Sequence, residues 1–211
     1  MNTITSKIAV LAVCALGAAA MNPAHATVIF DFTDPVYGSG NQGHMQTYTQ
    51  GTKNLTVHAF STILPDLPGD PASISNNVNG LGVIGDGDNN QVDNIGDEGI
   101  IEWLAFSTTT GTIEGVTIHQ LTNGEEADFW RATAPDGTPG TFTFLFTLNG
   151  ITGTDQFVSI DLAGDPYLLV SSGETESGFR VENVHVPEPA TLALFGLGLA
   201  GLGFARRKRM S

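Results

Sequence analysis

The chain has little cysteine and few basic residues. Its one cysteine, Cys14, lies near the N-terminus, so the rest of the chain has no disulfide and depends on its core, on oligomerisation or on bound ions for stability. Eight Lys and Arg residues stand against 22 Asp and Glu residues. Between residues 27 and 185 only three basic residues stand against 21 acidic ones, a net charge of −18. Such a surface repels phosphate backbones, which excludes nucleic acid as a partner.

The interior also lacks helical periodicity, because no ten-residue stretch between residues 27 and 185 repeats apolar side chains at helical spacing. Short alternating runs are instead separated by Gly, Pro, Asn and Asp, which is typical of strands. Nine strands are predicted, at residues 28–32, 54–60, 99–107, 112–121, 127–133, 141–148, 156–162, 167–171 and 178–186. Their spacing predicts one all-β domain over residues 27–185, an antiparallel β-sandwich of the jelly-roll type.

Two of these runs predict where side chains face. Simple alternation is expected to place three rings on one face of a strand, those of Phe142, Phe144 and Phe146. In the last run, four apolar residues share a face only if a β-bulge falls between the first two and the last two. These residues are Phe179, Val181, Val184 and Val186.

Residues 1–26 have the organisation of a signal peptide. Lys7 provides a positive start, residues 8–20 are apolar, and Ala24 and Ala26 form a small-x-small cleavage site. We expect the export machinery and signal peptidase to act here, so that the mature chain begins at Thr27.

Residues 186–211 have the organisation of a short membrane segment. The apolar stretch 190–205 is expected to be a transmembrane helix, and it lies between two motifs: Pro187, Glu188 and Pro189 before it, and Arg206, Arg207, Lys208 and Arg209 after it. Its uninterrupted apolar part, residues 192–205, would form a helix of about 21 Å, shorter than a hydrocarbon core of about 30 Å. Thinning of the bilayer and snorkelling of the basic side chains would be needed to span it. The cationic end is expected to stay in the cytoplasm.

This order of Pro-Glu-Pro, short apolar segment and basic terminus resembles the PEP-CTERM tail of Gram-negative envelope proteins. The resemblance implies recognition and cleavage by an exosortase near residues 187–189. It also implies a precursor anchored transiently in the inner membrane and a mature form at the cell surface or outside the cell. A non-enzymatic, adhesive or structural role in an exopolysaccharide-rich biofilm would follow. The alternative is a carbohydrate-binding module or a glycan-active enzyme carried on the same tail.

An acidic segment is the candidate cation site. Its oxygen-bearing residues are Asp86, Asp88, Asn90, Asp93, Asp97 and Glu98. Ca²⁺ is coordinated by carboxylate and carbonyl oxygens of this kind, and glycines in the segment let the backbone fold around an ion. An EF-hand is rejected, because Gln91 stands where that loop requires glycine and Glu98 is displaced by one position. A calcium-binding loop and a polar connector with Asx-turns both fit the pattern.

Aromatic residues suggest a ligand surface. Trp130, flanked by the polar region of Asp128 and Arg131, is the candidate for stacking on a sugar, whereas Trp103 lies in an apolar run and is expected in the core. The histidines are scattered, and no Ser lies in a nucleophile elbow, so the sequence predicts neither zinc nor triad chemistry. These histidines are His44, His58, His119 and His185.

Overall fold

Short alternating runs of the chain fold into antiparallel strands, as predicted. The computed structural model describes residues 27–63, 69–84, 91–95, 100–109, 111–138, 140–151, 155–173 and 178–188. Within these ranges the helical content is one 3-10 turn, η1 (Pro35–Tyr37), which the Asp34 side chain caps by accepting from the Val36 amide at 2.9 Å. No helix in the same ranges has the length and apolar character needed to cross a membrane. The all-β prediction is therefore confirmed for the described part of the chain.

Sheet B, as we name it, is built on a row of neighbouring strands. Their order is β12 (Phe142–Asn149), β11 (Glu126–Ala132), β14 (Tyr167–Ser172), β9 (Ile100–Thr108), β4 (Lys53–Ile63) and β3 (Met45–Gln50). The short strand β5 (Asp70–Pro71) extends the sheet beside β4, and β8 (Val92–Ile95) pairs with both β9 and β15.

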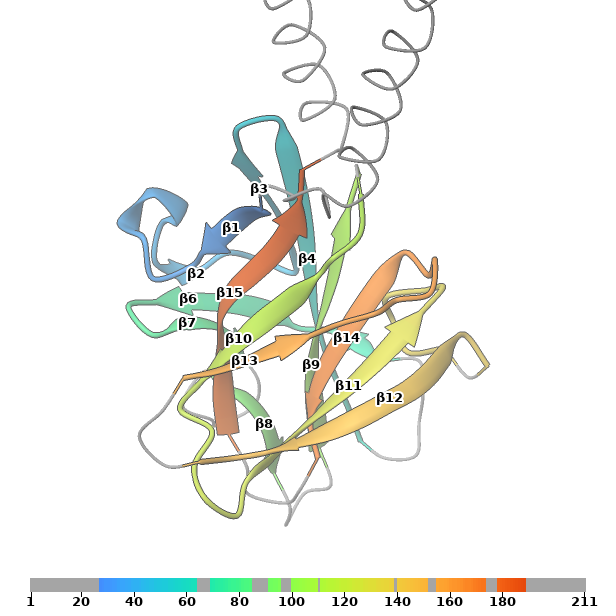
Figure 1. Cartoon of the computed structure of the whole chain (residues 1–211). Coiled ribbons are helices and arrows are strands. Elements are labelled where there is room, and N and C mark those ends of the chain that lie inside the picture. The colour runs from blue at the N-terminus through green and yellow to red at the C-terminus, as the bar shows by residue number, and fades with distance from the viewer. Residues whose placement is uncertain are drawn as a thin grey trace, which may run out of the picture. The chain divides into compact units, whose positions relative to one another are not determined.

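Sheet A is the second row, and it contains both ends of the domain. Its order is β13 (Gln156–Ser159), β10 (Gly115–His119), β15 (Gly178–Pro187), β7 (Gly80–Ile84), β6 (Ser73–Asn77) and β2 (Gly40–Asn41). The first strand, β1 (Thr27–Asp31), pairs with the last part of β15. Figure 1 shows β15 and β10 side by side, with β13 pairing along the other edge of β10.

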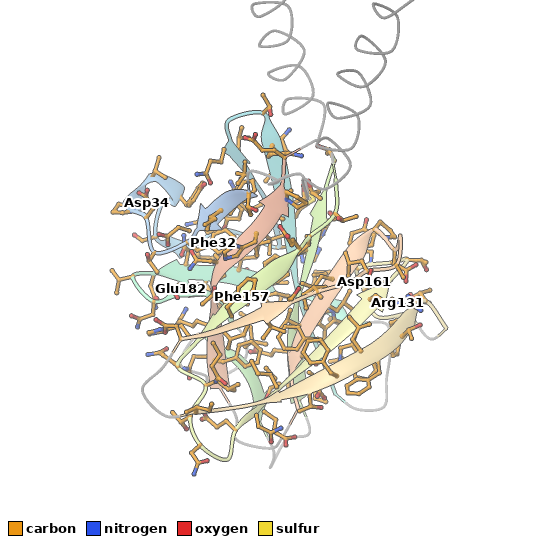
Figure 2. The ribbon with its side chains drawn as sticks, in the orientation of Figure 1. Phe32, Asp34, Arg131, Phe157, Asp161 and Glu182 are labelled. Atoms are coloured by element: carbon orange, nitrogen blue, oxygen red, sulfur yellow. The ribbon has the colours of Figure 1, made fainter. Side chains whose placement is uncertain are left out.

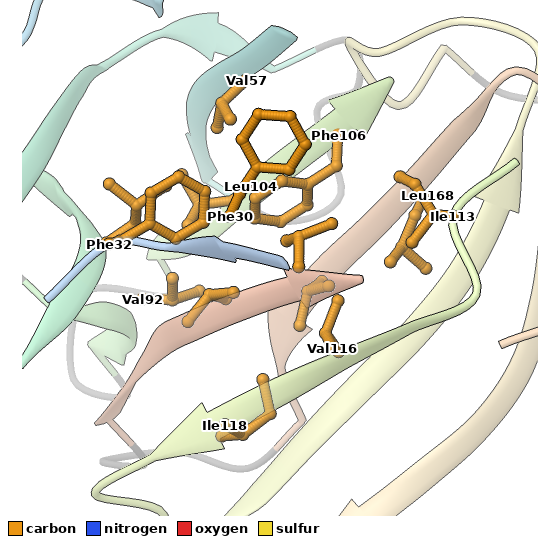
Figure 3. Close-up of a cluster of buried hydrophobic side chains, with 14 of the residues drawn as sticks. Phe30, Phe32, Val57, Val92, Leu104, Phe106, Ile113, Val116, Ile118 and Leu168 are labelled. Carbon is orange, nitrogen blue, oxygen red and sulfur yellow. The ribbon is translucent and has the colours of Figure 1, made fainter. Parts of the chain in front are cut away.

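The core lies between the two sheets. Phe30 and Val116 come from sheet A, and Val57, Phe106 and Leu168 come from sheet B; all five are fully buried in one cluster. Figure 3 shows these side chains meeting in the space between the strands. Each buried side chain of this kind stabilises the folded state by about 1.5 to 3 kcal/mol. Because Cys14 lies outside the domain, this core stabilises the domain without the help of a disulfide.

A β-bulge in β15 places its apolar residues on the core side. Thr117 of β10 pairs with Asn183, and the next residue pairs with Val181, so Glu182 is the extra residue. The four apolar residues expected to share a face after a bulge are all fully buried: Phe179, Val181, Val184 and Val186. That prediction is confirmed.

A second β-bulge corrects the prediction for β12. Phe129 of β11 pairs with Phe146 and Trp130 pairs with Phe144, so Leu145 is the extra residue. The ring of Phe146 stacks on the buried ring of Phe129 at 4.9 Å, while the ring of Phe144 meets Trp130 edge-on at 4.8 Å. The expectation that the rings at 142, 144 and 146 share one face is wrong, because the inserted residue reverses the alternation.

All nine predicted strands are present, and the structure adds six: β2, β3, β5, β6, β7 and β8. The added strands are short, polar or glycine-rich. β3, for example, has the sequence MQTYTQ, and its exposed residues outnumber its single buried residue, Tyr48. Such strands lack the apolar alternation that identifies a strand in sequence.

Candidate functional site

The outer face of sheet B, which points away from the core, carries a second apolar cluster. Its buried members are Phe60, Trp103, Ala105, Ala132 and Leu169, and Trp130 and Phe142 pack against them. Successive side chains of a strand point to opposite faces, so these residues alternate with the core residues of the same strands. The cluster is therefore a second, smaller core on this face, and the half-buried Trp130 and Phe142 lie against it.

A pocket of about 250 Å³ opens on this face. We call it the tryptophan pocket. Its lining residues are Thr62, Ile101, Trp103, Asp128, Trp130, Gly137, Phe142, Leu169, Ser171, Ser172 and Gly173.

Trp103 forms a fixed wall of the tryptophan pocket. Its ring stacks on Phe60 with centroids 5.5 Å apart and an interplanar angle of 19°, and its Nε1 donates to the carbonyl of Pro135 at 3.1 Å. The backbone of Gly69 covers the ring so closely that a Cβ there would lie 2.1 Å from Cη2. Trp103 is 5% exposed, as its apolar run predicts. It is anchored by packing and hydrogen bonding on several sides.

Trp130 is half-buried and more accessible to a ligand. The rings of Phe142 and Phe144 meet its indole edge-on, at 5.4 and 4.8 Å. Its Nε1 donates to Oγ of Ser171 at 3.3 Å. These contacts hold the indole in one orientation, which lowers the entropic cost of stacking a ligand on it. The structure thus places the predicted stacking residue in a pocket.

Polar groups line the pocket beside the two indoles. Asp128 and Ser171 are Cα partners on neighbouring strands, and Oδ1 of Asp128 accepts from Oγ1 of Thr147 at 2.5 Å. A Cβ at Gly173 would lie 3.1 Å from Cγ of Asp128, so a larger residue there would crowd this carboxylate. An aromatic surface with a few fixed polar groups suits a ligand with an apolar face and hydroxyl groups, as a sugar has.

The predicted processing motif begins inside the last strand. Pro187 is the final residue of β15 and is the Cα partner of Thr27, the predicted start of the mature chain. The two positions at which processing is expected therefore lie on adjacent strands. Glu188 is the last described residue. The other predicted residues of the two targeting segments lie outside the described residues: Ala24, Ala26, Pro189, Arg206, Arg207, Lys208 and Arg209.

The acidic segment also lies largely outside the described residues. Of its candidate ligands, Asp93 belongs to β8, where the backbone is described and pairs with Gly178. The calcium prediction therefore stays a prediction. The remaining candidates, outside the described ranges, are Asp86, Asp88, Asn90, Asp97 and Glu98.

Comparison with known proteins decides the nature of the tail. The family model described as the PEP-CTERM protein-sorting motif matches residues 185–209. The chain carries a PEP-CTERM sorting motif. This motif implies an exported protein whose membrane-anchored precursor is processed by an exosortase and sorted to the cell surface. No curated protein matches the chain.

Sequence reasoning missed most of the tryptophan pocket. Phe142 was expected on a face with Phe146, and no pattern linked Asp128 to Ser171, which is 43 positions later in the sequence. The sequence gives no sign of the bulge at Leu145, which places Phe146 on the opposite face from the other two rings of its strand. Trp130 alone was identified from its polar neighbours.

Proposed function

We propose that this chain is an exported envelope protein that an exosortase cleaves near Pro187 to Pro189, after signal peptidase has removed residues 1–26. The observation that carries the proposal is the PEP-CTERM match at residues 185–209, which begins within the last strand of the domain and continues beyond it. The mature β-sandwich acts without catalysis as an adhesive or structural component of an exopolysaccharide-rich matrix. Its strong negative charge supports a soluble, hydrated surface domain.

The chain order of the strands supports assignment of the domain to the jelly-roll class. From β9 onward the chain crosses repeatedly between the two sheets. Strands β9, β11, β12 and β14 belong to sheet B, and β10, β13 and β15, which alternate with them along the chain, belong to sheet A. Repeated crossing between two antiparallel sheets is typical of double-sheet Greek-key arrangements.

Recognition by the exosortase is tested by replacing Glu188 with Gln and following the intact mass and cell fraction of the protein in a host that has the exosortase. We expect the Glu188→Gln variant to keep its tail and stay with the membrane fraction. The matched control is Asp70→Asn, which removes one exposed carboxylate from β5 and leaves the motif unchanged. Normal processing of the Glu188 variant would show that Glu188 is not needed for recognition. A chain that lacks the tail should be absent from the membrane fraction and serves as the reference for the released protein.

A second candidate function, carbohydrate binding, is favoured by the tryptophan pocket. Its volume of about 250 Å³ lies just below the range of about 300 to 1,000 Å³ usual for ligand pockets, which suits one sugar unit. Asp128 is the one carboxylate among the described lining residues, whereas glycoside hydrolysis uses a pair. This composition supports binding in preference to turnover.

Carbohydrate binding is tested with a glycan array and with calorimetry on the best array hit. Trp130→Ala should weaken binding by about fivefold or more, if stacking of a sugar contributes as much as the about 1 to 3 kcal/mol of a nucleic-acid base on an aromatic ring. The matched control is Phe157→Ala, which removes a 56% exposed ring from sheet A and should leave affinity unchanged. Equal losses in both variants would contradict the tryptophan pocket as the binding site. Release of reducing ends during the assay would instead identify a glycan-active enzyme.

A further inference from the structure

Three potential metal ligands come together on the outer face of sheet A, opposite in the sandwich to the tryptophan pocket. They are His119 at the end of β10, Asp155 just before β13, and Glu182 in β15. β10 pairs with β13 on one side and with β15 on the other, so all three positions belong to adjacent strands. Figure 2 labels Glu182 on β15 and Phe157 on β13, the strands on either side of β10.

Glu182 lies at the bulge in β15. It is the inserted residue between Val181 and Asn183 that has no Cα partner in β10. Alternation from the buried Val181 turns Glu182 to the outer face, and the bulge then returns Val184 to the core. Bulges are common beside functional sites because they redirect one side chain without disturbing the rest of a sheet.

The ligand atoms of the three side chains already lie within 4.8 Å of one another. Nδ1 of His119 and Oδ1 of Asp155 are 2.5 Å apart, and these side chains are 32% and 49% exposed. An ion can therefore reach the cluster from solvent. The group combines one imidazole with two carboxylates, so a single protonated histidine cannot balance its negative charge.

The charged neighbours of the cluster that the structure describes include a further carboxylate and a buried guanidinium. Asp31 of β1, whose Cα partner is Asn183, adds another carboxylate near the cluster. Arg180 lies opposite His119 in the strand register, but it is 3% exposed and its Nη1 donates to the carbonyl of Gly80 at 3.3 Å. Its guanidinium is thus directed toward the adjoining strand β7.

We propose that His119, Asp155 and Glu182 bind a divalent transition-metal ion of the Zn²⁺ class. One nitrogen and two carboxylate oxygens are a ligand set that suits Zn²⁺, whereas Ca²⁺ and Mg²⁺ prefer oxygen throughout. Three protein ligands on an accessible face leave a coordination position for water or an external ligand. Binding requires a deprotonated ligand nitrogen of His119 and two ionised carboxylates, so protons compete with the metal for the site.

The test is calorimetric titration of the purified, chelator-treated full chain with ZnCl₂. We expect one site that is lost or weakened at least tenfold in His119→Ala and in Glu182→Gln. The control His185→Ala removes a histidine that lies in β15, outside the cluster. Its ring centroid is 4.8 Å from that of Phe157. This variant should bind Zn²⁺ as the unaltered chain does. Undiminished binding by Glu182→Gln, or an equal loss in the control, would overturn the proposal.

The acidic segment is an alternative source of metal binding and requires its own variant. The double variant Asp86→Asn, Asp88→Asn should keep the Zn²⁺ site, and an excess of Ca²⁺ should not displace the ion. Co²⁺ provides a readout independent of stability, because its visible absorption bands report the geometry and ligands of its coordination sphere and should be altered or lost when His119→Ala removes the nitrogen ligand. Loss of Zn²⁺ binding in the Asp86 and Asp88 double variant, together with normal Co²⁺ bands in His119→Ala, would place the metal site in the acidic segment. That outcome would refute the proposed cluster.

Discussion

Gly69 lies directly against the indole of Trp103, where an added Cβ would be 2.1 Å from Cη2 and 2.5 Å from Cζ2. The indole cannot withdraw easily, because it stacks on Phe60 and its Nε1 donates to Pro135. Gly69→Ala is therefore expected to lower the free energy of unfolding by about 1 to 3 kcal/mol, the usual cost of overpacking. Urea unfolding followed by circular dichroism measures the change.

The same substitution in a Trp103→Phe background is the control, because a smaller ring leaves room for the added methyl group. The cost of Gly69→Ala should be clearly smaller there. An unchanged cost would show that the backbone at position 69, and not the contact with the indole, determines the effect.

Tyr48 has a buried hydroxyl that is not hydrogen-bonded within the described part of the chain. Its ring is 3% exposed and packs against Phe32 and Tyr37 at 5.0 and 5.3 Å. Tyr48→Phe keeps the ring contacts and removes an unsatisfied polar atom, so stability should rise by about 1 kcal/mol. Tyr48→Leu, which loses the ring contacts, is the comparison and should lower stability.

Burial also raises the pKa of Tyr48 above its ordinary value of 10.0. Since the unfolded chain releases this proton more readily than the folded one, Tyr48 contributes a loss of stability as the pH rises above about 10. Tyr48→Phe should therefore unfold at higher pH than the unaltered protein. Identical alkaline unfolding curves would indicate that the hydroxyl is hydrogen-bonded or hydrated in solution.

The bulge in β12 predicts unequal roles for two phenylalanines that are two positions apart. Phe146 packs into the core against Phe129, whereas Phe144 is 47% exposed beside Trp130. Phe146→Ala should cost about 2 to 3 kcal/mol, somewhat less than the about 3 to 5 kcal/mol of a fully buried ring. Phe144→Ala should cost less than about 1 kcal/mol. Denaturant midpoints distinguish the two, and equal costs would contradict the bulge.

Two half-buried histidines predict a loss of stability at acidic pH. Burial, followed by the nearby His44, lowers the pKa of His58 from 6.5, and burial lowers the pKa of His185 despite the opposing effect of Glu114. The unfolded chain then binds more protons just below pH 6.5, so stability is lost as the pH falls through this value. His58→Gln with His185→Gln should reduce that loss relative to the unaltered chain. Urea midpoints between about pH 5 and pH 8 test this, and parallel curves for the two proteins would refute it.

The strands with strong apolar alternation were predictable from sequence. The run ending in Val184 and Val186 even required the bulge that the structure shows, because hydrophobic residues spaced 2, 3 and 2 apart can share a face in no other way. The sequence around Leu145 does not indicate a bulge in the same way. Its strand is apolar at several consecutive positions, so either register buries hydrophobic side chains, and packing against Phe129 decides between them.

Composition and local motifs determined the class and destination of this protein: the sorting motif, the absence of disulfides and the all-β fold each depend on residues that are near one another in the chain. Tertiary structure decided how the two candidate sites are assembled. Trp103 meets Trp130 in one pocket, and His119 meets Asp155 and Glu182, because strands from distant parts of the chain become neighbours in a sheet. Strand pairing depends on the burial of the whole core, and no local pattern specifies which distant side chains it brings together.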